Sequence, residues 1–399
     1  VSGKHPVVLS KFHKGLEYDI DVVAFRGTVL CLAISEHLEP AGVHSGDATM
    51  FLPPQRLTAA AEDVMIKQVT QLCEALCVTG PMNVQFLWVP SDNGPGRIMV
   101  IEANVRCSRS VPFVSKTLGI SFPALIVDAI TALHEERPAG YLAPVYADLH
   151  DWRRGLSFVA CKAAMFSFSR LAGSDPILGV EMRSTGEVGV IGRGAYEAFL
   201  NALTSCHIKL PRPNGSKSTG ILIAIDTLDD AVLFAPFAVK LAKLYEIYVT
   251  ASCSTVLFGA GIRAKVLHSP KEKSFEPNVA TFFKTGRITL TIQLRDKSRD
   301  FHLRRIATRV LHQGSRVSPT DPSGLNDPTD DYVIRRLAVD AQCPLFTELS
   351  MASFFADAMT AVAPRLKADD CLYDVDALTD YVPAHTVVNT AVAAPPRKP

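Results

Sequence analysis

Two neighbouring segments of this sequence carry oxygen-bearing side chains at the spacing with which a β-strand presents them together. Residues two apart in a strand lie on the same face, so Glu102 and Asn104 share one side of the segment RIMVIEANVR. Gln85 lies in the preceding strand-like segment, MNVQFLWV. If the two segments form a symmetric hairpin around the polar loop between them, Gln85 lies directly opposite Glu102.

This set of side chains suggests a site for a divalent cation and an anion. Mg²⁺ prefers oxygen ligands and commonly takes one or two carboxylates, leaving the other positions to waters and phosphates. Arg106 and Arg109 follow at once, and a guanidinium fork suits phosphate. A cation site beside two arginines resembles phosphoryl-transfer machinery. The alternative is a solvated strand face with ordinary surface charges, and the spacing alone does not decide between them.

The elements that must position these residues are mixed α and β. In LEYDIDVVAF the side chains alternate between two faces, and a turn at Arg26-Gly27 leads into TVLCLAISEHL, so this region predicts a hairpin. The stretch from Pro54 to Gly80 predicts a helix with Met65, Val69, Leu72 and Leu76 on its apolar side and Gly80 as its C-cap. A further helix is predicted from about Ser121, with Pro123 in its first turn, through Ala132.

The second half of the chain alternates strands and helices. The predicted strands are GILIAID, YEIYVT, AKVLH, ITLTIQL and PLFTE. The predicted helices lie near 229–244, 255–259, 278–285, 332–341 and 351–362. This alternation favours a parallel sheet that helices cover on both faces. The linker LPRPNGSKSTG precedes this region, 314–331 reads as a long polar loop, and the end of the chain reads as a flexible tail.

Composition excludes several classes of function. The 399 residues carry 41 basic and 40 acidic side chains, a net charge of +1, and 48% hydrophobic residues. Such a balance indicates no nucleic-acid partner and no acidic membrane partner. No apolar run approaches the ~20 residues that cross a bilayer. Nine cysteines without a CxxC pair favour reduced thiols and a cytoplasmic location. The first residues lack a signal peptide and an initiator Met, which suggests a piece of a longer chain.

The segments around the predicted site closely resemble the ATP-grasp core of carbamoyl-phosphate synthetase large chains. The similarity rests on VTGPMNVQF, VIEANVRCSRSVPFVSKTLGI, AISEHLEPAGVHSGDATMFLPP and DPILGVEMRSTGEV. Other ATP-grasp ligases, such as biotin carboxylases, share the Glu-x-Asn strand but do not combine it with EMRSTGEV and SVPFVSKTLG. The resemblance implies an α/β and α+β fold class, with the C-terminal half of an ATP-grasp domain in the carbamoyl-phosphate-forming unit.

The resemblance also implies a role for each matching residue of the hairpin. Gln85, Glu102 and Asn104 match metal ligands that hold Mg²⁺ or Mn²⁺ against the phosphates of ATP. Arg106 and Arg109 match residues that stabilise the anionic intermediate and the transferring phosphoryl group.

Two further residues match ATP-binding positions. Glu17 matches the acid that hydrogen-bonds the ribose hydroxyls, although without the resemblance it would read as a solvated glutamate of an edge strand. His44 matches a histidine near the nucleotide phosphates, and would otherwise read as a turn residue. Arg183 and Glu187, in MRSTGEV, are expected to form a structural ion pair.

The implied activity is ATP-dependent phosphorylation of carbamate to carbamoyl phosphate, within a carbon-nitrogen ligase that uses glutamine, bicarbonate and two ATP. The expected partners are the rest of the synthetase chain and a glutamine amidotransferase subunit or domain. Pyrimidine synthesis is the expected pathway, with arginine synthesis as the alternative. The glycine-rich phosphate-covering loop of an ATP-grasp unit is missing from these residues, so the isolated chain is expected not to turn over.

The last part of the chain resembles the methylglyoxal-synthase-like regulatory domain of the same family, a Rossmann-like fold. We therefore expect four regions: a partial ATP-grasp domain at 1–209, a linker at 210–218, the regulatory domain at 219–365 and a tail at 366–399. A nucleotide effector is a candidate partner.

The phosphate loop of that regulatory family is poorly matched. Thr250, Ser252 and Ser254 could still bind a phosphate through hydroxyls and backbone N–H groups, and Arg295 and Lys297 read better as surface charges. Two alternatives to the synthetase activity remain: a regulatory nucleotide-binding module, and a methylglyoxal-type lyase, for which the expected Asp and His are not convincing.

Overall fold

The computed structural model describes residues 11, 13–147, 151–153, 156–213, 220–294 and 329–365. The described residues fall into two compact units. The first runs to Lys162 and also includes Val180–Met182, and the second contains Ala163–Gly179 and the described residues from Arg183 onward. Most of the predicted linker, most of the long polar loop and the tail lie outside the described residues. The predicted domain boundary near residue 209 stays a prediction, because a compact unit of the structure need not coincide with a domain.

The first unit is organised around a β-hairpin that the sequence predicts correctly. Strand β1 (Leu16–Phe25) pairs antiparallel with β2 (Thr28–His37). The connecting residues Arg26 and Gly27 have φ angles of 48° and 84°. Two consecutive positive φ angles are typical of the type I′ turn, whose twist matches that of the strands it joins.

The sheet of this unit extends the hairpin on both sides. Its strands follow the order β5-β4-β1-β2-β3-β6, and neighbours run antiparallel. The added strands are β3 (Met50–Leu52), β4 (Gly80–Val89), β5 (Arg97–Asn104) and β6 (Val159–Met165). The predicted hairpin of β4 and β5 is therefore confirmed, and it lies beside β1.

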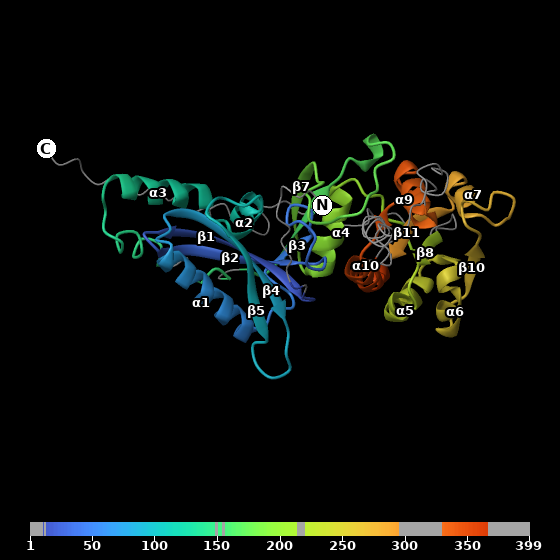
Figure 1. Ribbon diagram of the computed structural model, residues 1–399, viewed down its shortest axis with the longest axis horizontal. Helices are drawn as coiled ribbons and strands as arrows, with labels where there is room; N and C mark the ends of the chain where they lie inside the picture. Colours follow the sequence, from blue (N-terminus) through green and yellow to red (C-terminus); the bar gives the residue numbers. More distant parts are fainter. Residues whose placement is uncertain are drawn as a thin grey trace, which may run out of the picture. The chain divides into compact units, whose positions relative to one another are not determined.

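Helices cover both faces of the central strands. Helix α1 (Ala59–Ala75) packs on β2 and β4, and α3 (Phe122–His134) packs on β1 and β4. Figure 1 shows α1 and α3 on opposite sides of the β1–β2 hairpin. As a consequence, every residue of β1 after Leu16 is buried, including the acidic ones.

The ends of these helices follow local rules, with two differences from the predictions. Thr58 caps α1 by accepting from the N–H of Ala61. The helix ends at Ala75 with Leu76 as its C-cap, so the predicted C-cap at Gly80 is wrong, and Gly80 begins β4. Leu76 is exposed, because the buried side of α1 continues through Cys73 instead.

The predicted helix at Ser121 is confirmed, and a second helix precedes it. The Ser121 hydroxyl accepts from the N–H of Ala124, which starts α3. Helix α2 (Val111–Leu118) was not predicted, and it ends at Gly119, whose φ is 67°. Among the described residues no single helix is long and apolar enough to cross a membrane, and α2 and α3 reach that length only as a pair bent by 104°.

The second unit contains the predicted parallel sheet. Its strand order is β10-β9-β8-β11-β12, with parallel pairing throughout. The strands are β8 (Gly220–Ile225), β9 (Glu246–Thr250), β10 (Ala264–Leu267), β11 (Ile288–Leu294) and β12 (Leu345–Phe346). All five coincide with predicted strands to within two residues at each end.

The helices of this unit alternate with its strands, as the sequence predicts. They are α5 (Leu228–Ala242), α6 (Ala251–Gly259), α7 (Val279–Lys284), α9 (Asp330–Asp340) and α10 (Leu349–Val362). Figure 1 shows α5 and α6 on one side of the sheet and α7 and α9 on the other. The unit also contains the 3-10 turn η2 (Phe168–Arg170), β7 (Gly186–Gly192) and α4 (Ala195–Ser205), and α4 packs on β7 and α10.

Candidate active site

The register of β4 and β5 places the three predicted cation ligands together. Gln85 pairs with Glu102, as predicted, and Asn83 pairs with Asn104. The hairpin is not symmetric, because a bulge lies between Gln85 and Phe86 and adds Ile101 on the other strand. Glu102 and Asn104 lie on the same face of β5. Glu102 is the cross-strand partner of Gln85 on β4.

The hydrogen bonds of this group leave oxygen atoms available for a cation. The Asn104 side chain donates through Nδ2 to Oε1 of Glu102 at 2.8 Å. The Gln85 side chain donates through Nε2 to the hydroxyl of Ser45 at 3.1 Å. Each amide nitrogen is used in a hydrogen bond, so each amide keeps its oxygen for another ligand. A donor set of one carboxylate and two amide oxygens fits Mg²⁺ or Mn²⁺.

All seven residues that the sequence assigns to the site line one cavity of about 660 Å³ in the first unit. They come from β1, from the segment between β2 and β3, from β4, and from β5 with the segment that follows it. The seven are Glu17, His44, Gln85, Glu102, Asn104, Arg106 and Arg109. The cavity is also lined by Val180 and Met182, which belong to the same unit.

The two arginines stand on the exposed rim of this cavity. Arg106 directly follows the turn after β5, and one of its guanidinium nitrogens donates to the carbonyl of Cys107 at 3.0 Å. Both guanidinium groups are exposed to solvent. Five donors in a planar fork allow such a group to bind phosphate oxygens in pairs, so this rim suits an anion.

His44 lies in a tightly bonded loop between β2 and β3. Its Nδ1 accepts from the N–H of Gly46 at 3.0 Å, and its carbonyl accepts from the N–H groups of Asp47 and Ala48. An added Cβ at Gly46 would lie 2.9 Å from Sδ of Met182, so the loop closely approaches that side chain. With Nδ1 in use as an acceptor, the ring presents Nε2 to other groups.

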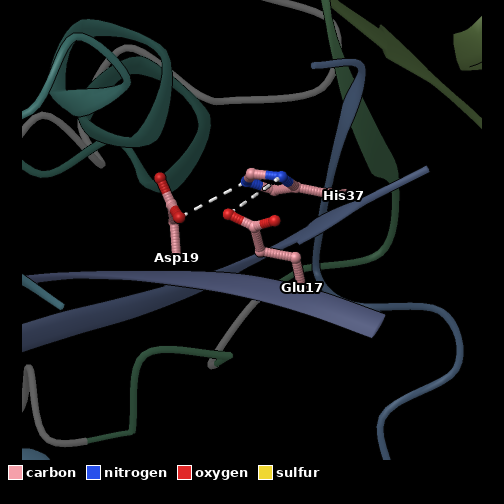
Figure 2. Close-up of side chains that lie close together, drawn as sticks. All are labelled: Glu17, Asp19 and His37. Atoms are coloured by element: carbon pink, nitrogen blue, oxygen red, sulfur yellow. Dashed lines mark ion pairs between the residues drawn. The ribbon is translucent and has the colours of Figure 1, made fainter. Parts of the chain in front are cut away.

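A buried cluster of charged side chains lies beside the cavity, and the sequence did not predict it. Figure 2 shows Glu17, Asp19 and His37 pointing toward one another. Nε2 of His37 lies 3.3 Å from Oδ1 of Asp19, and Nδ1 lies 3.9 Å from Oε1 of Glu17. Burial alone would lower the pKa of His37, but the two carboxylates outweigh it and the pKa is raised. The two carboxylates therefore favour the charged form of the His37 ring.

Glu17 is not the solvated edge-strand residue that its surroundings in the sequence suggest. Strand β1 lies between β4 and β2, and Glu17 is only 4% exposed. Burial raises the pKa of Glu17, and the opposing effect of His37 is smaller. Counting outward from the Arg26-Gly27 turn does not find the cluster, because it places position 36 opposite position 17. The irregularity between Val23 and Ala24 shifts the register by one residue, so that Glu36 pairs with Tyr18 instead.

A further buried acid, Asp21, joins three elements behind the cavity. Oδ1 of Asp21 accepts from the amide of Asn83 at 3.0 Å, and Oδ2 accepts from the hydroxyl of Ser110 at 2.8 Å. Burial raises the pKa of Asp21 to about 6, although its hydrogen bonds oppose the shift. Asp21 therefore links β1 and β4 to the start of α2, and this helps to fix the segment that carries Arg106 and Arg109.

The predicted phosphate positions of the second unit lie where β9 passes into α6. The hydroxyls of Thr250 and Ser252 are 2.9 Å apart, and Ser254 donates to the carbonyl of Ala251 at 2.9 Å. Arg295 and Lys297 lie outside the described residues. Arg183 donates to the carbonyl of Asp175 at 3.3 Å, and its predicted ion pair with Glu187 stays a prediction.

Comparison with known proteins identifies the family. A family model described as "Carbamoyl-phosphate synthase L chain, ATP binding domain" matches residues 2–131. "Multifunctional protein ura1" of Schizosaccharomyces pombe is 36% identical over 363 residues, 90% of this chain and 14% of that protein. "Carbamoyl phosphate synthase arginine-specific large chain" of Eremothecium gossypii is 38% identical over 368 residues, 91% of this chain and 29% of that protein.

A mammalian protein is similar over the same share of the chain. "Carbamoyl-phosphate synthase [ammonia], mitochondrial" of Mus musculus is 35% identical over 370 residues, 90% of this chain and 21% of that protein. The chain belongs to the carbamoyl-phosphate synthetase large-chain family, and it spans less than a third of the length of these relatives. The crystal structure of L-amino acid ligase from Bacillus licheniformis aligns with a TM-score of 0.32 at 16% identity, over 48% of this chain and 52% of that one. A TM-score this low does not establish a shared fold.

Proposed function

We propose that the cavity of the first unit binds ATP with a divalent cation and phosphorylates carbamate to carbamoyl phosphate. In this reaction an oxygen of carbamate attacks the γ-phosphorus, and the bond to the bridging oxygen of ADP breaks. One observation carries the proposal: the seven residues assigned from the sequence line a single cavity. Similarity over nine-tenths of the chain to proteins named carbamoyl-phosphate synthase supports it.

The oxygens of Gln85, Glu102 and Asn104 would hold Mg²⁺ or Mn²⁺ beside the phosphates. When bound, such a cation neutralises the charge that develops on the phosphate oxygens. Arg106 and Arg109 bind the transferring phosphoryl group and the carbamate from the exposed rim, where their fixed positive charges stabilise the negative transition state.

Glu17 and His44 orient the rest of the nucleotide. The Glu17 carboxylate accepts hydrogen bonds from the ribose hydroxyls, and the His37 ring next to it favours its ionised form. His44 donates from Nε2 to a phosphate oxygen, because its Nδ1 already accepts from Gly46. Both residues reach the cavity from β1 and from the loop after β2.

The whole assembly is a further part of the proposal. The chain works with the remaining synthetase sequence and with a glutamine amidotransferase, in the cytoplasm and in pyrimidine synthesis. Arginine synthesis is the alternative, since one relative is named arginine-specific, and another relative is named for ammonia. We retain the prediction that the 399 residues alone do not turn over.

The second unit fits a methylglyoxal-synthase-like regulatory domain that binds a nucleotide effector. Its parallel sheet supports this assignment, because ligands of such sheets bind at the carboxyl ends of the strands. The second candidate function is therefore a regulatory nucleotide-binding module without catalysis in this chain. Titration of the chain with UMP, UTP, UDP and phosphoribosyl pyrophosphate tests that candidate separately.

Equilibrium dialysis of labelled ATP against the 399-residue chain tests the main proposal. We expect ATP binding that requires Mg²⁺ and that Glu102→Gln strongly weakens. Asp92→Asn is the matched control, because Asp92 is an exposed acid in the loop of the same hairpin and does not line the cavity. ATP binding that is indifferent to Mg²⁺ and to Glu102→Gln would contradict the assignment.

A further inference from the structure

We propose that Arg335 is a positioning residue for the ATP cavity, because it holds one half of a loop whose other half lines that cavity. The inference rests on the proposed function. The loop connects β6 to β7, and the N–H of Thr185 closes it by donating to the carbonyl of Met165 at 2.8 Å. Val180 and Met182, on the second half of this β6–β7 loop, line the cavity.

The first half of the loop is bound by α9, which lies 160 positions further along the chain. The two carboxylate oxygens of Asp175 accept from Nε and Nη2 of Arg335, each at 2.7 Å. In this two-point geometry a guanidinium and a carboxylate fix each other's orientation. The other terminal nitrogen, Nη1, donates at 2.8 Å to Oε1 of Gln293, which lies near the end of β11. Arg335 is therefore fixed to the sheet on one side and to the loop on the other.

Two further side chains of α9 bind the same half of the loop. The hydroxyl of Tyr332 donates to the carbonyl of Gly173 at 2.8 Å. Nη1 of Arg336 donates to three backbone carbonyls of the loop. They belong to Phe168, Leu171 and Ser174, at distances of 3.3, 3.4 and 2.9 Å. Because neighbouring residues of a helix point about 100° apart, the two arginines reach different parts of the loop.

The burial of the two arginines indicates a role beyond stability. Arg335 is 4% exposed and Arg336 is 9% exposed. A buried ion pair adds little net stability compared with an apolar contact of the same volume, whereas its paired hydrogen bonds impose one geometry. Two other residues of α9, Ile334 and Ala338, already pack in the apolar core of the second unit. The arginines are therefore best explained by the loop whose position they fix.

The second half of the loop connects this contact to ATP. Val180 follows Asp175 after five positions in the chain. Met182 closely approaches the segment that carries His44, since an added Cβ at Gly46 would lie 2.9 Å from its Sδ. When Asp175 is released from α9, the loop gains other conformations, and the cavity wall is complete in a smaller fraction of molecules. The apparent affinity for ATP falls by that fraction.

Equilibrium dialysis of labelled ATP with Mg²⁺ against the 399-residue chain measures this effect. We expect Asp175→Asn to weaken ATP binding about fivefold, within the range that such indirect contacts produce. Asp357→Asn is the matched control, because it breaks the ion pair of Asp357 with Lys240, at 2.5 Å, between α10 and α5 of the same unit. The two aspartates are similarly exposed, at 35% and 27%. The control should bind ATP as the wild type does.

Two further measurements separate positioning from a general effect on stability. Hydrogen exchange should become faster in peptides of the β6–β7 loop in Asp175→Asn, and should stay unchanged there in Asp357→Asn. In a background that carries both Val180→Ala and Met182→Ala, Asp175→Asn should have no additional effect on ATP affinity, because the groups that the contact positions are gone.

The outcomes separate the inference from the proposed function. If the wild type binds no ATP, or if Glu102→Gln binds it equally well, the proposed function fails and the inference with it. If Glu102→Gln abolishes binding but Asp175→Asn leaves it unchanged, the site stands and the role of Arg335 is overturned. An equal loss in Asp357→Asn would also overturn it. If Asp175→Asn is unfolded by circular dichroism, Arg335→Lys provides the same test, because it keeps the positive charge and loses the planar fork.

Discussion

Two groups of side chains on the antiparallel sheet of the first unit contain acidic residues, and they differ in exposure to solvent. Glu102 lies on exposed β5 beside two amides, and its group opens onto the cavity. Glu17 and Asp19 lie on fully covered β1, with His37 between them. The oxygens of Glu102 face water and the cavity. Glu17 also lines the cavity, but the His37 ring lies beside it and Asp19.

This difference separates an open site that can accept a cation from a buried cluster in which a histidine lies beside the acids. Buried carboxylates are costly unless a partner neutralises them, and here the His37 ring lies beside both acids. Exposed carboxylates bear no such cost and keep their affinity for a ligand. The presence of acidic residues therefore does not identify the cation site. The site is identified by oxygen atoms that are accessible to a ligand.

Removal of His37 should have the largest effect on stability. His37→Leu leaves two buried carboxylates without their positive partner, and we expect a loss of about 3–5 kcal/mol in the free energy of unfolding. Urea denaturation measures it. His134→Gln, an exposed change at the end of α3, is the control and should stay within about 0.5 kcal/mol. Unchanged stability of His37→Leu would show that the cluster needs no internal cation.

Removal of the Glu102 charge should instead affect binding and spare stability. We expect Glu102→Gln to weaken Mn²⁺ binding, measured by electron paramagnetic resonance of the free ion, by more than ~30-fold, because ligand charge strongly sets divalent-cation affinity. Its midpoint in urea should match that of the wild type. Asp92→Asn should bind Mn²⁺ normally. A large loss of stability in Glu102→Gln would contradict the comparison, because Glu102 would then contribute to folding as the buried cluster does.

Another buried acid, Glu39, makes the stability of this unit depend on pH. Burial raises the pKa of Glu39 from 4.5 to about 7, although hydrogen bonds from Thr49 oppose the shift. Because the folded state holds this proton more tightly than the unfolded state, the stabilisation is complete below pH 4.5 and is lost as pH rises through 7.

Comparison with Glu39→Gln tests this dependence. Between pH 5 and pH 8 the wild type should lose about 2 kcal/mol more than Glu39→Gln in urea denaturation. Parallel curves for the two proteins would contradict the raised pKa.

The smallest effect is expected when the rim arginines are changed. Arg106→Ala and Arg109→Ala should alter Mn²⁺ affinity by less than about threefold, since a guanidinium offers no ligand atom to a cation. Both variants should weaken binding of ATP in equilibrium dialysis. A strong loss of Mn²⁺ affinity in either variant would place the arginines in the cation site rather than beside it.

Much of this arrangement is readable from the sequence, because strand spacing and turn residues act locally. Arg26-Gly27 marks the turn between β1 and β2, and the alternation in β5 puts Glu102 and Asn104 on one face. The bulge that adds Ile101 was not readable, since a bulge depends on how two strands pack. Without it, pairing continued from Phe86 and Val100 would put Gln85 opposite Ile101 rather than Glu102.

The burial of the acidic residues of β1 could not be predicted from the sequence. The acids of β1 alternate with apolar residues, and such a pattern is typical of a half-exposed strand. The structure covers both faces of β1, because α1 and α3 pack on opposite sides of the hairpin. Whether Glu17 is solvated therefore depends on helices that are more than 40 residues away in the chain. Lys162, buried on β6, gave no local signal either.

The most direct test of the account is the position of a bound Mn²⁺ ion in crystals of the chain, located by anomalous diffraction. We expect a peak within roughly 2.5 Å of oxygens from Gln85, Glu102 and Asn104. A peak inside the Glu17–Asp19–His37 cluster with none beside Glu102, or density that shows the Gln85 nitrogen facing the ion, would contradict it.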